Sequence, residues 1–148
     1  MTHLDTELQH LKNDTIRMWH LVQDQLSKGK NALVHFDKDM AHEVLAREKR
    51  VNAYELKIDR DCENIFALFN PVAVDLRFVL AVLKINSNLE RIGDIAEGVA
   101  RFVIDIDKNF DAELLQATRV IEMFETSISI LNDAATAFET EDTRMART

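Results

Sequence analysis

The sequence is poor in residues that break helices and in the residue that forms covalent cross-links. It contains one cysteine, one proline and three glycines among 148 residues. A single cysteine excludes an internal disulfide and favours a reducing compartment, so we expect a cytoplasmic protein. The scarcity of proline and glycine, with 47% hydrophobic and 30% charged residues, favours helix along nearly the whole chain.

Two further absences limit the partners of the chain. It has no apolar run of 18 residues and no charged-apolar-small leader, which predicts neither direct membrane insertion nor export. Basic residues number 18 against 26 acidic ones, for a net charge of -8. This balance disfavours nucleic acid, anionic lipid and free phosphate, and it favours cations or basic protein surfaces.

Apolar residues recur at steps of three and four through most of the chain, which is the period of an amphipathic helix. Breaks fall after Gly29, at Asn70-Pro71 and at the segment DIDKNFD. The pattern predicts an all-α, antiparallel up-and-down bundle of four long helices joined by short connections. The predicted helices cover about residues 3–29, 36–69, 82–106 and 110–138.

A weak internal repeat relates the two ends of the chain. Residues 116–148 align without a gap on residues 11–43, at an offset of 105. We interpret residues 1–108 as a three-helix repeat and residues 109–148 as the start of a second repeat, one long helix followed by a truncation. A short protein with a frayed tail is the alternative. The matched pairs include Met18 with Met123, Trp19 with Phe124, Leu26 with Leu131, Asp37 with Asp142, Met40 with Met145, and Ala41 with Ala146.

Charged residues form two lines with steps of four, three and four, so each line occupies one side of a helix. The segments that carry them are joined at Asn70-Pro71 and should be antiparallel neighbours. We therefore expect the two lines to lie side by side on one outer face, away from the apolar seam. The lines are Glu48, Asn52, Glu55 and Asp59 in the second segment, and Glu90, Asp94, Glu97 and Arg101 in the third.

Three interpretations of these lines stay open: a solvated face, a partner surface, or ligands for a cation. Carboxylates four residues apart on two adjacent helices can hold hard or borderline cations through oxygen. Glu97 and Arg101 fit a plain ion pair. We expect Gly93 to permit close helix approach, and Arg91 to bond across to a carboxylate of the second helix.

The sequence lacks the motifs of common enzymes. It has no Glu-x-x-His pair, no glycine-rich phosphate loop, no nucleophile elbow and no zinc-type spacing of cysteine and histidine. All five histidines fall in the first helix or just after it, where we expect surface positions. The sequence therefore predicts a protein that is not an enzyme. The histidines are His3, His10, His20, His35 and His42.

The segment DLRFVLAVLKINSNLERIGDIAEGVA, residues 75–100, resembles the most typical segment of the PhoU family. Members carry an Asp-Leu-Arg run followed by Leu-Glu-Arg-Ile-Gly-Asp, here at residues 75–77 and 89–94. Upstream, EVLAREKRVNAYELKID looks like the second-helix segment of the family. The family is built of two three-helix repeats, in agreement with the offset of 105.

The resemblance implies a metal site and other functional positions. Some members hold iron or zinc at Glu/Asp-x-x-x-Asp motifs on these two helices. Glu90 and Asp94 match fully, whereas Glu48 is followed by Asn52, whose neutral amide oxygen replaces a carboxylate and which Glu55 could offset. The candidate ligands for iron, zinc or another divalent cation are Glu48, Asn52, Glu55, Glu90 and Asp94, and the structural or partner-facing candidates are Asp75, Arg77, Arg91 and Gly93.

The resemblance also implies a function. PhoU-like proteins are cytoplasmic, often homodimeric regulators that act between the phosphate ABC transporter, including its ATPase subunit, and a sensor histidine kinase. They repress phosphate-starvation signalling when phosphate is plentiful. A structural dimerisation or adaptor bundle without metal is the alternative, and a carboxylate-bridged metal-binding bundle is another.

An incomplete second repeat would leave an apolar flank exposed, which predicts dimerisation or domain swapping.

Overall fold

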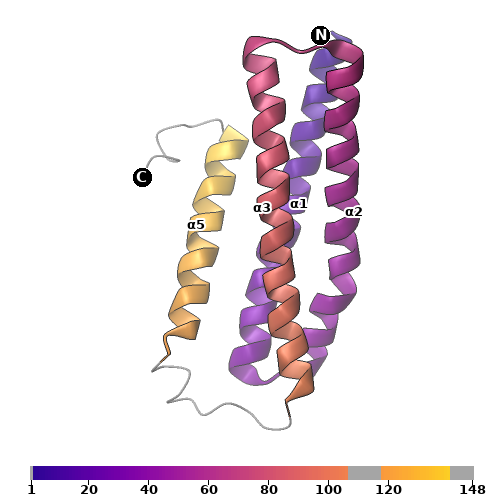
Figure 1. Ribbon diagram of the computed structural model, residues 1–148. Coiled ribbons are helices and arrows are strands. Elements are labelled where there is room, and N and C mark those ends of the chain that lie inside the picture. The colour runs from indigo at the N-terminus through magenta and orange to yellow at the C-terminus, as the bar shows by residue number, and fades with distance from the viewer. Residues whose placement is uncertain (1, 107–117, 141–148) are drawn as a thin grey trace.

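The computed structural model describes residues 2–106 and 118–140, and it confirms the predicted all-α antiparallel bundle (Figure 1). Successive helices run in opposite directions along a common axis. Three of the described helices span the length of the bundle, and the last one is shorter and lies at its side. The helices are α1 (His3–His35), α2 (Lys38–Phe69), α3 (Ala73–Asp105) and α5 (Val120–Thr140).

Local side-chain chemistry fixes the ends of α1 and α2. Thr2 and Asp5 form a capping box, in which each side chain accepts a hydrogen bond from the backbone N–H of the other residue. At the other end of α1, Phe36 adopts a left-handed conformation with φ 50°. Asp37 then caps α2 by accepting a hydrogen bond from the Met40 amide at 3.0 Å. The two helices are therefore joined by a tight turn.

Two predicted helix limits differ from the structure. The third helix was expected from about residue 82, but α3 begins at Ala73, directly after the break at Asn70-Pro71. The predicted end of the first helix is also wrong. The sequence suggested that the first helix ends near Gly29, but α1 continues to His35. Gly29 is buried inside the helix, where a Cβ would lie 3.7 Å from the Ala96 carbonyl oxygen of α3. This glycine marks contact with a neighbouring helix and does not cap α1.

The break at Asn70-Pro71 is present, and Asn70 takes the left-handed conformation with φ 47° that ends α2. Other expectations lie partly outside the described residues. They are the start of the last helix near Phe110 and the repeat matches at Asp142, Met145 and Ala146. The division into repeats at residue 108 stays a prediction. Helices α1 to α3 fall before that residue, and α5 falls after it.

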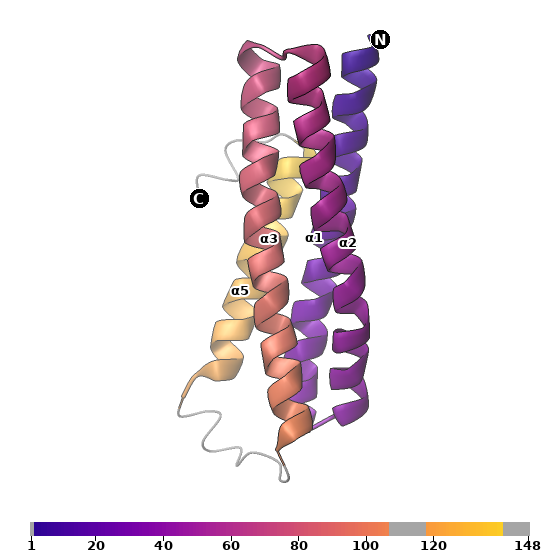
Figure 2. The same cartoon turned by 45° about the vertical axis from the view of Figure 1, so that its right-hand side comes forward.

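The core lies between α1, α2 and α3, which all pack on one another, whereas α5 joins the bundle along α1 (Figure 2). The Trp19 indole N–H donates to the Leu131 carbonyl oxygen at 3.1 Å. The Phe138 ring lies 5.5 Å from the Trp19 ring and 6.2 Å from the Phe78 ring, measured between centroids. Aromatic packing and one buried hydrogen bond thus hold α5 against the three-helix core.

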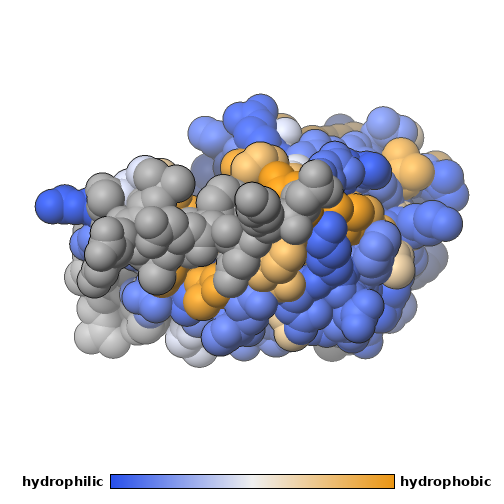
Figure 3. All heavy atoms as spheres, turned by 90° about the horizontal axis from the view of Figure 1, so that it is seen from below, coloured by the Kyte–Doolittle hydropathy of each residue, from blue (hydrophilic) through white to orange (hydrophobic). Residues whose placement is uncertain are grey.

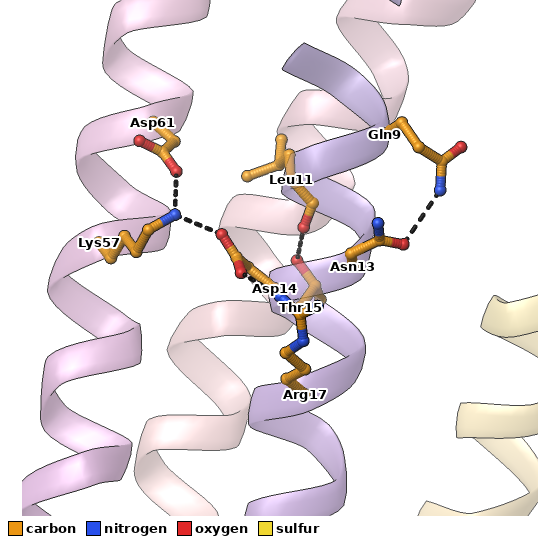
Figure 4. A network of polar contacts seen from close by, with 8 residues as sticks. All are labelled: Gln9, Leu11, Asn13, Asp14, Thr15, Arg17, Lys57 and Asp61. Atoms are coloured by element: carbon orange, nitrogen blue, oxygen red, sulfur yellow. Dashed lines mark hydrogen bonds and ion pairs between the residues drawn. The ribbon is translucent and has the colours of Figure 1, made fainter. Parts of the chain in front are cut away.

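A polar network fixes the register between α1 and α2 (Figure 4). The ammonium group of Lys57 bonds to Asp14 and to Asp61, and Arg17 pairs with Asp14 at 3.2 Å. The hydrogen bonds from Lys57 to Asp14 and Asp61 raise the pKa of Lys57. Each carboxylate in this network therefore has a cationic partner, including Asp14, which is buried.

Among the described residues, no helix combines the length and the hydropathy that crossing a lipid bilayer requires.

Candidate metal centre

Three carboxylates converge where α2 packs against α3. Glu48 of α2 and Asp94 and Glu97 of α3 each offer one oxygen, and these oxygens all lie within 4.8 Å of one another. Glu48 is 3% exposed, Glu97 is half-buried, and Asp94 is open to solvent. The group therefore has a buried floor and an accessible side, which suits a ligand that enters from solvent. We call Glu48, Asp94 and Glu97, together with the adjacent Glu55 and Glu90, the acidic cluster.

Glu48 is the buried member of the acidic cluster, and one of its oxygens has no partner. The Gln25 amide donates to Glu48 Oε2 at 3.4 Å, whereas Glu48 Oε1 is buried without a hydrogen bond from the described residues. Burial raises the pKa of Glu48 to about 7, and the nearby charges of Glu97, Asp94 and Glu90 contribute to the rise. A buried carboxylate oxygen without a donor is costly, and a bound cation would compensate for it.

The buried position of Glu48 follows from its place on α2. Val44 and Val51 lie four residues before it and three after it, and both are completely buried. Glu48 therefore belongs to the core-facing line of the helix. The expectation that this residue lies on an outer face is wrong. Gly93 of α3 provides the room, because a Cβ there would lie 3.3 Å from Glu48 Oε1 and 3.2 Å from Val51 Cγ1.

Glu90 and Glu55 extend the negative charge along the two helices. Burial raises the pKa of Glu90, with further effects from the hydrogen bond to Asp94 and from the charges of Asp94 and Glu55. Burial likewise raises the pKa of Glu55, which also feels Asp59 and Asp94. These mutual effects show that the predicted ligands Glu48, Glu55, Glu90 and Asp94 form one electrostatic group.

Cationic side chains do not neutralise most of this group. Among the described residues, the one ion pair made by a member of the acidic cluster joins Glu97 to Arg101 at 2.7 Å. That pair was predicted, whereas Glu97 was not among the candidate ligands, although it also lies beside Glu48. The contrast with the network around Lys57, where every carboxylate is paired, distinguishes this cluster from an ordinary solvated ion-pair surface.

Other predicted site residues lie outside the group of three oxygens. Asn52 is exposed on α2. Arg91 is exposed, and its charge acts on Glu90 of its own helix. The predicted bond from Arg91 across to α2 is therefore wrong, because the side chain points into solvent. Asp75 and Arg77 lie near the start of α3, about 25 Å along the helix from Asp94.

The donors of the acidic cluster are all carboxylate oxygens, which suit hard divalent cations. All five histidines are exposed, four of them on α1 and His42 near the start of α2, as expected. The thiol of Cys62 is buried, and burial raises its pKa to about 12, so it is poorly suited to nucleophilic chemistry. The oxygen donors of this region are suited to a cation placed between the two helices.

A family model described as the PhoU domain matches residues 15–103, which is more than half of the chain. The chain belongs to the PhoU family. The matched residues cover most of α1 and all of α2, together with α3 as far as Val103. They include the whole acidic cluster. The resemblance seen in the sequence is thereby confirmed.

Two similar proteins support the assignment to the PhoU family. The chain is 33% identical over 141 residues to the phosphate-specific transport system accessory protein PhoU homolog of Aquifex aeolicus, covering 95% of this chain and 63% of that protein. It is 32% identical over 138 residues to the accessory protein PhoU of Escherichia coli, covering 93% and 56%. The chain thus spans less than two thirds of the length of these relatives.

Solved structures agree with the fold. The crystal structure of the phosphate transport system regulatory protein PhoU from Streptococcus pneumoniae matches with a TM-score of 0.83 at 30% identity, covering 97% of this chain and 67% of that one. The crystal structure of PhoU from Pseudomonas aeruginosa matches with a TM-score of 0.85 at 28% identity, covering 97% and 68%. The arrangement of helices, α5 included, is therefore that of the PhoU fold.

Proposed function

We propose that the chain is a non-enzymatic regulator of phosphate uptake and phosphate-starvation signalling that works in the cytoplasm through protein contacts. Membership in the PhoU family and relatives named as accessory or regulatory proteins of phosphate transport support this proposal. Its partners would be the ATPase subunit of the phosphate ABC transporter and a phosphate-sensing histidine kinase. The net charge of -8 suits contacts with basic protein surfaces.

The proposal includes a divalent cation bound at the acidic cluster. The observation that carries it is the buried Glu48 Oε1, which has no donor among the described residues and lies in a group with Asp94 and Glu97. Glu48, Asp94 and Glu97 would hold the ion, and Glu90 and Glu55 would add charge nearby. Iron and zinc are the metals that the family resemblance implies. The oxygen-only donor set favours iron, manganese or another hard cation over zinc.

A cation at this position would link α2 to α3 and neutralise part of the surface between them. The carboxylates repel one another when the site is empty. Their shared attraction to a bound cation would then hold the helices together. Binding could thus alter the surface that a protein partner meets, without any bond being made or broken. This mechanism requires no catalytic group.

The proposal is tested in cells that lack their own PhoU-family gene and carry a reporter of phosphate starvation. We expect the wild-type chain to restore repression at high phosphate and Glu90→Ala/Asp94→Ala to leave the reporter on. Glu63→Ala/Asp105→Ala, which removes two exposed carboxylates elsewhere on the same helices, should repress like the wild type. Immunoblots at equal abundance exclude a simple loss of protein.

Two results would contradict the proposal. Failure of the wild-type chain to repress would exclude the regulatory function in these cells. Repression by Glu90→Ala/Asp94→Ala at wild-type strength would favour the alternative, a structural adaptor bundle that does not use a metal.

A further inference from the structure

The outer side of α3 carries a line of exposed residues with the spacing of a helix-packing seam. The steps along the line are three, four, three and four, so its members form one stripe along the helix. The stripe lies opposite Val82, Leu89 and Ala96, which are buried in the core. We call it the outer line of α3, and its members, all exposed, are Arg77, Leu80, Lys84, Ser87 and Arg91.

The outer line is open to solvent along its whole length. Helix α3 packs on α1 and α2, and no described helix crosses its outer side (Figure 1). Seen from the end where α3 finishes and α5 begins, hydrophobic patches interrupt a mainly hydrophilic surface (Figure 3). On the outer line, Leu80 is such an apolar side chain, 51% exposed and placed between two cations. An exposed leucine in a stripe with this spacing is typical of a surface that accepts another helix.

The three cations of the outer line lack the carboxylate partners that other basic residues of the bundle have. On α1, Arg17, Lys28 and Lys30 form ion pairs at 3.2, 3.3 and 3.1 Å. No ion pair joins a cation of the outer line to another described residue, although the charge of Arg91 acts on the adjacent Glu90. The cations recur every seven residues and span about 21 Å of helix. The line therefore presents a regular positive charge to a partner.

We propose that the outer line of α3 is a docking surface for an acidic amphipathic helix of a partner protein. A helix that lies along α3 repeats its contacts every seven residues, as the cations do. Acidic side chains at one seam position of the partner meet Arg77, Lys84 and Arg91. An apolar side chain at the other seam position packs on Leu80. The proposal rests on the protein contacts of the proposed function and adds the chemistry of one of them.

The charge of the whole molecule selects this occupant against larger anions. With a net charge of -8, the chain as a whole repels a nucleic acid, whereas a short helix with one acid per heptad carries far less charge. The acidic cluster occupies the side of α3 that faces α2, with Glu90, Asp94 and Glu97. A cation bound there lowers the repulsion between the cluster and an acidic partner, so the two sites favour each other.

Fluorescence anisotropy with a labelled synthetic helix tests the identity of the occupant. The probe has about 21 residues, with Glu at one seam position of every heptad and Leu at the other. We expect it to bind the full chain saturably, and the same helix with Lys in place of Glu to bind at least about tenfold more weakly. A chelator in the buffer makes the result independent of a bound metal. Loss of reporter repression with intact peptide binding would thus contradict the proposed function alone.

Charge reversal tests the position of the docking surface. Arg77→Glu/Lys84→Glu should weaken binding of the acidic helix at least about tenfold. Arg50→Glu/Arg60→Glu is the matched control, because it reverses two exposed cations of α2 that form no ion pair with a described residue. The control should weaken binding less than about threefold, through long-range charge alone. Circular dichroism verifies that both variants stay helical.

Three results would overturn the proposal. The first is the absence of saturable binding, or equal binding of the helices that carry Glu and Lys. The second is an equal effect of the two double reversals, which would show that the helix responds to overall charge and not to the outer line. The third is self-association of the chain that Arg77→Glu/Lys84→Glu abolishes in analytical ultracentrifugation, because a second copy would then be the occupant.

Discussion

Gly93 of α3 lies directly against the carboxylate of Glu48 on α2. A Cβ at position 93 would approach Glu48 Oε1 to 3.3 Å and Val51 Cγ1 to 3.2 Å. Both neighbours are buried, so neither can move away freely. The missing side chain at Gly93 therefore makes room for the buried acid, and this single contact links the close packing of α2 and α3 to the formation of the acidic cluster.

Gly93→Ala should destabilise the protein, although alanine is the better helix former. Crowding against Val51 and Glu48 should cost about 1–3 kcal/mol, which exceeds the gain of about 1 kcal/mol in helix propensity. Gly98→Ala is the control on the same helix, because a Cβ there meets nothing within 4 Å and should stabilise the fold. Urea unfolding measures both effects. Equal stabilisation by the two substitutions would contradict the tight contact at Gly93.

Glu48 should make the stability of the metal-free protein fall as the pH rises. Its pKa is about 7 in the folded chain and 4.5 when unperturbed, so its folded form binds the proton more tightly. The stabilising effect of that proton is complete below about pH 4.5 and is lost as the pH rises through 7. Glu48→Gln should therefore raise the free energy of unfolding by about 2 kcal/mol at pH 8 and change it little near pH 4.5.

Urea titrations with a chelator at both pH values test this pH dependence. Glu63→Gln, which alters an exposed residue of α2, serves as the control and should show no such difference. An equal effect of Glu48→Gln at both pH values would show that the side chain acts through packing and not through its charge.

Trp19→Phe should loosen α5 selectively. The substitution removes the indole N–H that donates to the Leu131 carbonyl, while it keeps an aromatic ring near Phe138. The lost bond should cost about 1 kcal/mol. Hydrogen exchange followed by mass spectrometry should show that the substitution accelerates exchange, relative to the wild type, more in α5 than in α2 or α3. Uniform acceleration in all the helices would mean that Trp19 stabilises the whole bundle and does not hold α5 in particular.

The fold was predictable because its signals are local and repeated. Apolar residues at steps of three and four gave the helices, and Asn70-Pro71 gave the break that makes α2 and α3 neighbours. The predicted helix end at Gly29 was wrong because a glycine inside a helix and a glycine at its end look alike in sequence. Contact with Ala96 of α3 explains the residue, and only the packed structure reveals that contact.

The sequence indicated most residues of the acidic cluster, but it did not indicate their geometry. Spacing and family resemblance selected Glu48, Glu90 and Asp94, yet spacing alone assigned them to an outer face. Glu48 lies on the same line of α2 as the buried Val44 and Val51. The sequence alone did not show that this line faces the core. Glu97 was placed in the same line as Glu90 and Asp94, but it was interpreted as the partner of Arg101 and left out of the candidate ligands, whereas the structure also brings it to Glu48.

The most direct test of the central claim is the metal content of the purified chain, measured by elemental analysis after incubation with iron, zinc or manganese and removal of unbound ion. We predict a divalent ion in fixed proportion to the wild-type protein and its loss from Glu90→Ala/Asp94→Ala, while Glu63→Ala/Asp105→Ala keeps it. Absence of metal from the wild type even after incubation with excess ion, or equal retention by Glu90→Ala/Asp94→Ala, would contradict the claim that the acidic cluster is a cation site.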